Sequence, residues 1–176
     1  MSDDWTDLAD RVAGHVRNYL DGLARLANGE GGDAFLPLLL VEVAQISLVG
    51  SQLGAVKDVI LETNIEPPIG EDPDIDPLRV ALAARLGEVD DYAEVFDPYK
   101  DTKITPYRLS DDLTAVAADL VHGLRHYDAG RPLEALWWWQ FSYFNTWGNH
   151  VGAALRALHA LVAHVRLDVA EEPTVV

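Results

Sequence analysis

The stretch WWWQFSYFNTW (Trp137–Trp147) decides how this chain folds, because it holds four of the five tryptophans of the protein. On a helix that turns about 100° per residue, its aromatic side chains point in every direction. A surface helix keeps one polar face. We therefore expect this helix to lie at the centre of the fold or to have a second partner.

Helical spacing of apolar residues also extends over the remainder of the chain. Trp5, Leu8, Val12 and Val16 begin one such stripe, with the three- and four-residue steps of an amphipathic helix. The sequence predicts an all-α single domain over residues 1–176, a bundle of about five main helices with a long C-terminal aromatic helix. The expected main helices are 4–28, 33–54, 77–87, 110–129 and 132–169.

Proline, glycine and acidic residues predict the segments between these helices. We expect loops at 63–76 and 97–109, a short helical piece from Tyr92 to Tyr99, and a frayed tail at 171–176. The last helix is expected to bend near Gly148, since glycine weakens a helix interior. No alternating pattern of a β-strand is evident in the sequence.

Charge and composition exclude several classes of function. The net charge of the 176 residues is −16, which repels nucleic acid and anionic lipid. Cysteine is absent, which removes disulfides, thiolate metal sites and thiol catalysis. No phosphate loop, dinucleotide fingerprint or nucleophile elbow is present. The sequence predicts no cofactor and no direct contact with nucleic acid.

The N-terminus and the most apolar run predict a soluble cytoplasmic protein without a membrane partner. Met1-Ser2-Asp3-Asp4 is acidic, whereas a signal peptide begins with basic residues. The run from Phe35 to Val49 contains Glu42 and Gln45, and it is too short to span a bilayer.

Two polar residues are predicted to lie on apolar helix faces. On a helical wheel, Phe35, Ile46 and Leu53 fall within about 40° of Glu42, and Gln140 is central to the stripe of the last helix. A buried carboxylate needs a partner, which Gln140 or Tyr143 can provide. Two interpretations remain open: a hydrogen-bonded contact that fixes two helices, or a pocket with a perturbed acid. The residues assigned to this network are Glu42, Gln45, Gln140 and Tyr143.

The back face of the aromatic helix predicts an interface. It carries Trp138, Asn145, Asn149 and Arg156, and tryptophan and arginine are enriched where proteins associate. The alternative is that another helix of the same chain covers this face.

One triplet has the spacing of metal ligands. Asp119, His122 and His126 lie at positions i, i+3 and i+7, but the wheel places them on the solvent side of their helix. A carboxylate-bridged metal site needs inward-facing ligands from several helices. We therefore interpret the triplet as a weak metal candidate on a solvated charged face.

Four segments resemble a family of bacterial domains of unknown function. The members of that family are acidic and cytoplasmic, and they are found mainly in actinobacteria. They are Phe35–Val43, Glu94–Tyr99, Leu109–Leu113 and EALWWWQFSY at Glu134–Tyr143. The resemblance covers most of residues 5–168 and implies an all-helical fold. It transfers no catalytic residue.

These observations predict a non-catalytic protein-interaction module. The expected partner is a second copy of the chain, giving a homodimer, or another protein. The alternative is a small-molecule-binding protein or enzyme whose polar site surrounds Glu42 and Gln140.

Overall fold

The computed structural model describes residues 2–61, 66–68, 70–100 and 102–167, and it confirms the predicted all-α bundle. The chain forms α1 (Ser2–Ala27), the 3-10 helix η1 (Gly32–Ala34), α2 (Phe35–Ala55), α3 (Asp76–Leu86) and the 3-10 helix η2 (Gly87–Val89). Strands β1 (Asp91–Glu94) and β2 (Thr105–Arg108) follow. The chain continues with α4 (Leu109–Asp128), α5 (Pro132–Ser142), the π-helix η3 (Tyr143–Trp147) and α6 (Gly148–Leu167). The expected tail at 171–176 lies outside the described residues.

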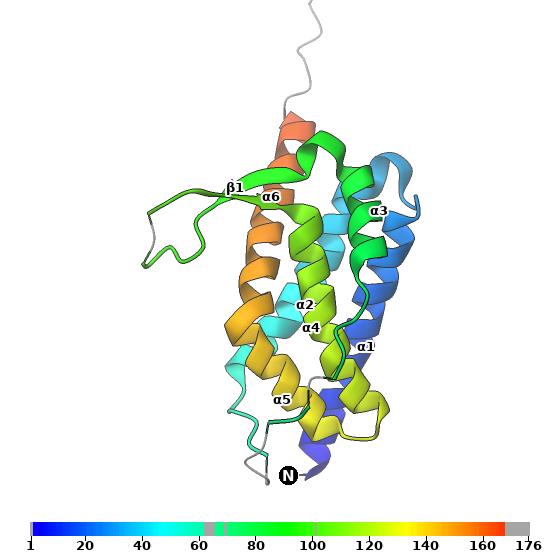
Figure 1. Cartoon of the computed structure of the whole chain (residues 1–176), viewed down its shortest axis with the longest axis vertical. Helices are drawn as coiled ribbons and strands as arrows, with labels where there is room; N and C mark the ends of the chain where they lie inside the picture. The colour runs from blue at the N-terminus through cyan, green and yellow to red at the C-terminus, as the bar shows by residue number, and fades with distance from the viewer. Residues whose placement is uncertain (1, 62–65, 69, 101, 168–176) are drawn as a thin grey trace, which may run out of the picture.

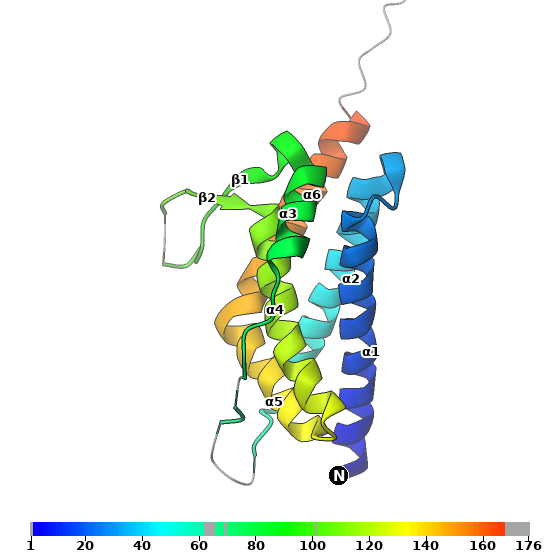
Figure 2. The same ribbon diagram turned by 45° about the vertical axis from the view of Figure 1, so that its right-hand side comes forward.

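Four helices run side by side along the long axis of the molecule and enclose the core (Figures 1 and 2). α1 packs on α2, α2 on α6, α6 on α4, and α4 on α1. α5 packs mainly against α4, and α3 covers part of α1 and α4. The largest fully buried side chains are Trp139, Trp147 and Tyr19. Trp138, Trp139 and Trp147 therefore lie in the core of the bundle, whereas Phe141 and Phe144 of the same stretch are exposed.

The long C-terminal helix is continuous but irregular at its centre. Between α5 and α6, residues 143–147 form one turn of π-helix, which inserts a residue and redirects the helix axis. A Cβ on Gly148 would stand 2.3 Å from the carbonyl oxygen of Tyr143. Gly148, at the predicted bend, is therefore required because the backbone of Tyr143 leaves no room for a side chain.

The segment after α3 differs from the prediction. Instead of a short helix at 92–99 and a loop to 109, the chain forms a two-stranded antiparallel hairpin in which Asp91 pairs with Arg108 and Glu94 with Thr105. Each strand has only four residues, too few for alternation to stand out in the sequence. Residues 95–100 and 102–104, between the strands, project from the bundle as an arm, on the left in Figure 1.

α2 is the most apolar helix of the fold. Glu42 is its only charged residue. With the preceding turn, α2 forms a segment, residues 32–55, that is long and apolar enough to cross a membrane. About a third of this apolar segment is buried in the bundle. α2 packs on α1 and α6 with one side, and apolar residues on its other side are exposed.

Candidate functional site

Gln140 is buried, as predicted, but its partners belong to the end of α2. Its side-chain nitrogen donates to the carbonyl of Leu53 at 2.9 Å and to that of Lys57 at 3.2 Å. Its side-chain oxygen accepts from the backbone N–H of Val59 at 2.8 Å. The last carbonyls of a helix lack partners within the helix, so Gln140 closes the C-terminus of α2.

Glu42 lies elsewhere, and the predicted shared network with Gln140 is wrong. The carboxyl of Glu42 is half-buried against Gly22 of α1, where an added Cβ would stand 2.5 Å from it. It opens onto a polar depression that Gln45 also lines. The helical wheel misplaced Glu42 because apolar residues lie on all sides of α2. The middle of the apolar residues is therefore not the middle of the side that is buried. Tyr143 packs instead against Gly50 and Trp147.

Burial raises the pKa of the Glu42 carboxyl above its ordinary value, against the opposing charge of Arg25. A carboxyl whose pKa is higher in the folded chain binds more protons there than in the unfolded chain, so stability falls as pH rises through the folded pKa. We expect Glu42→Gln to be more stable than the wild type at neutral pH. The difference should shrink as pH falls through the folded pKa. Urea unfolding across a pH series measures this, and a constant difference at all pH values would contradict it.

The predicted interface around Trp138 is covered by the same chain. The indole nitrogen of Trp138 donates to the carbonyl of Asp119 at 3.0 Å, and the ring contacts His122 edge-on at 5.5 Å between centroids. Only 7% of Trp138 remains exposed. At Trp138 this face is therefore covered by a helix of the same chain, α4, and not by a second copy. Asn145 is exposed and donates to the carbonyl of Phe141.

The predicted metal triplet is not on the solvent side. His122 and His126 are buried, because α5 crosses the face of α4 that the wheel assigned to solvent. His126 contacts Glu134 at 2.9 Å between Nδ1 and Oε2. The carboxyl of Asp119 accepts from the hydroxyl of Thr146, while burial raises its pKa. Among the described residues, no group of three histidine, aspartate or glutamate side chains could hold a metal ion.

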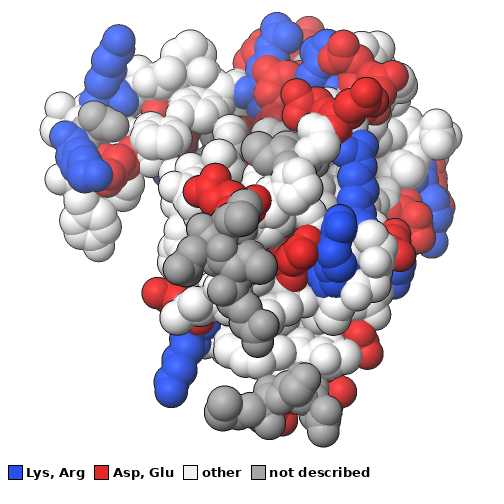
Figure 3. All heavy atoms as spheres, turned by 60° about the horizontal axis from the view of Figure 1, so that its bottom comes forward, with Lys and Arg blue, Asp and Glu red and all other residues white. Residues whose placement is uncertain are grey.

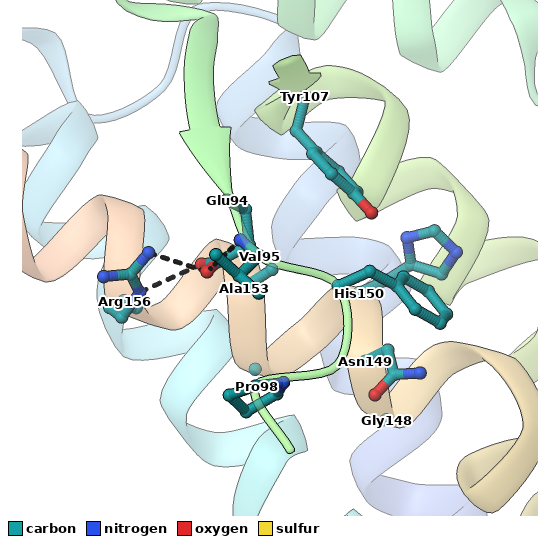
Figure 4. Close-up of a pocket in the computed structure, with 11 residues that line it drawn as sticks. Glu94, Val95, Pro98, Tyr107, Gly148, Asn149, His150, Ala153 and Arg156 are labelled. Atoms are coloured by element: carbon teal, nitrogen blue, oxygen red, sulfur yellow. Dashed lines mark hydrogen bonds and ion pairs between the residues drawn. The ribbon is translucent and has the colours of Figure 1, made fainter. Parts of the chain in front are cut away.

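Asn149 and Arg156, two of the predicted interface residues, line a groove between the arm and α6 (Figure 4). We call it the arm groove, and its volume is about 560 Å³. Arg156 binds Glu94 of β1 through two hydrogen bonds of 2.9 and 2.7 Å. This bidentate ion pair ties α6 to the hairpin at one end of the arm groove.

A buried carboxylate lies beneath the other end of the arm groove. Asp112, in the first turn of α4, accepts from the hydroxyl of Tyr92 through one oxygen and contacts Nδ1 of His150 through the other at 2.7 Å. Burial and this hydrogen bond raise the pKa of Tyr92, so its hydroxyl stays protonated. No spacing in the sequence indicates this cluster, since Asp112, Tyr92 and His150 come from three different elements.

The outer side of α2 presents a second unusual surface. We call it the α2 stripe. Its members lie three and four residues apart and are all exposed: Leu38, Val41, Gln45, Leu48 and Gln52. The exposed fractions of Leu38, Val41 and Leu48 are 41%, 49% and 60%. This spacing is that of the contact positions of a coiled coil.

Comparisons with known proteins identify the fold but no activity. The family model for a domain of unknown function (DUF5063) matches residues 3–164. The crystal structure of protein BF1032 from Bacteroides fragilis is 20% identical in sequence and superimposes with a TM-score of 0.62. That match covers 98% of this chain and 93% of the other chain. No protein of curated function matches.

Proposed function

The chain belongs to the family of domains of unknown function DUF5063, and we propose that it is a non-catalytic protein-interaction module that forms a homodimer through the α2 stripe. The observation that carries this proposal is the exposure of Leu38, Val41 and Leu48 at coiled-coil spacing on one helix. Exposed apolar side chains that form a continuous surface mark contact sites.

The distribution of charge makes α2 the surface on which a second copy meets the least repulsion. A twofold interface brings the same surface of both copies together, so a net charge of −16 opposes association over most of the molecule. The space-filling view shows acidic side chains gathered in the upper part of one face, with basic side chains among them (Figure 3). α2 itself adds little to this repulsion, because Glu42 is its only charged residue and packs against Gly22 of α1.

The size and character of the α2 stripe also suit a helix-to-helix contact. Leucine and valine alternate with Gln45 and Gln52, whose amides can donate to and accept from each other across a twofold axis. α2 continues over 21 residues, long enough for several layers of contact along one face.

Sedimentation velocity over a micromolar concentration series tests the homodimer. We expect the wild type to sediment at twice its 19.4 kDa mass and the double variant Val41→Glu, Leu48→Glu to sediment as a monomer, because each new charge would face its copy across the interface. Val80→Glu is the control, since Val80 is 58% exposed on α3. It should remain a dimer.

A wild type that stays monomeric over the whole series would overturn the homodimer. A double variant that still forms dimers would overturn the assignment to the α2 stripe.

A further inference from the structure

The arm groove has the features of a site for a small molecule. None of its lining residues belongs to the α2 stripe. We propose that the arm groove binds a flat, uncharged, largely apolar molecule that carries an N–H or O–H donor, which Nε2 of His150 accepts.

The walls of the arm groove suit a flat apolar molecule. On one side stand Val95, Phe96 and Pro98 of the arm. On the other side, α6 contributes Gly152 and Ala153. A Cβ on Gly152 would meet no atom within 4 Å, so this wall has open space above its backbone. Binding sites for small molecules are typically concave, apolar and supplied with few polar groups.

His150 supplies an oriented polar group at one end of the arm groove. Figure 4 shows His150 and Tyr107 extending toward each other there. The side chain of Asp112 is 2% exposed, whereas that of His150 is 32% exposed. In the neutral tautomer whose Nδ1–H donates to Asp112, Nε2 of His150 is an acceptor. The hydroxyl of Tyr92 satisfies the second oxygen of Asp112 and helps to keep the carboxylate in place.

The charges around the arm groove favour an uncharged ligand. Arg156 is the cationic side chain that lines it, and both of its hydrogen bonds go to Glu94. The guanidinium and the Glu94 carboxylate thus neutralise each other, so neither offers an unpaired charge to a ligand. A net charge of −16 repels anions. An apolar ring with one donor satisfies His150 without introducing a charge.

Indole and benzofuran form a matched pair of probes. Both are flat, uncharged and nearly equal in size, but indole has an N–H where benzofuran has an oxygen. We expect indole to produce saturable chemical-shift changes at Val95, Ala153 and His150 in NMR titrations of the full chain. Loss of one hydrogen bond to His150 should weaken binding of benzofuran about ten-fold.

Two variants locate the probe. Gly152→Leu fills the arm groove from an exposed position and should abolish the saturable changes. His150→Phe keeps a ring but removes the acceptor, so it should bind the two probes equally. Gly14→Leu is the control, since a Cβ at Gly14 also meets nothing within 4 Å, and it should bind indole like the wild type. Circular dichroism verifies that each variant is folded.

Three results would overturn the proposal. Absence of saturable changes at the groove residues would remove the site. Equal affinity of the wild type for indole and benzofuran would remove the role of His150. Indole binding that survives in folded Gly152→Leu would place the probe elsewhere. If His150→Phe fails to fold, the comparison of the two probes in the wild type still decides the role of His150.

Discussion

Gly123→Ala is expected to destabilise the protein by about 3 kcal/mol, from overpacking of a filled core together with a weakened buried hydrogen bond. A Cβ at Gly123 would stand 2.1 Å from the indole nitrogen of Trp139. Trp139 is fully buried and cannot turn away into solvent. Its indole nitrogen also donates to the carbonyl of Leu120 at 3.0 Å, and a displaced ring would lose this bond. α4 and α5 would have to separate.

Thermal unfolding and urea titration measure this effect. For a domain of this size, a loss of about 3 kcal/mol lowers the melting temperature by roughly 10 °C. Gly14→Ala is the matched control, because a Cβ at Gly14 meets no atom within 4 Å. Alanine is preferred to glycine inside a helix, so this control should gain about 0.5–1 kcal/mol. Equal stability of the two variants would contradict the packing described for Gly123.

Gln140→Leu is expected to cost about 3 kcal/mol. The leucine fills a similar volume but leaves the N–H of Val59 and the carbonyl of Leu53 without the partners they have in the wild type. A buried polar group without a partner costs about 1–3 kcal/mol. Asn18→Leu, an exposed position on α1, is the control and should change stability by less than about 0.5 kcal/mol.

Hydrogen exchange separates the role of Gln140 from general loss of stability. In Gln140→Leu, the amide of Val59 should exchange faster than expected from the change in global stability, because its acceptor is gone. Unaltered protection of Val59 would show that Gln140 does not close the end of α2.

The helices could be predicted because their signals are local. The spacing of Trp5, Leu8 and Val12 identifies α1, and Asp76-Pro77 marks the start of α3, where proline in the first turn costs no hydrogen bond. The hairpin could not be predicted in this way. Its strands are short, and they depend on contacts made far along the chain, such as the bond from the N–H of Leu109 to the carbonyl of Asp90.

The candidate sites depended on tertiary structure to a greater extent. The wheel predicted correctly that Gln140 is buried, because it lies centrally in an apolar stripe. It could not identify Leu53 and Val59 as partners, since hydrogen bonds between helices depend on how the helices pack. His122 and Trp138 show the same limit. A helix face with polar or mixed residues is predicted to be exposed, unless the packing of another helix on it is known.

The sequence by itself determined the helical class and the excess of negative charge, because periodicity and ionisation are properties of the chain alone. Tertiary structure decided which side of α2 is exposed and which residues meet beneath the arm groove. The apolar residues of α2 surround the helix, so only packing against α1 and α6 selects the buried side. Asp112, His150 and Tyr92 come together because α4, α6 and the hairpin pack against one another, and no local pattern encodes that meeting.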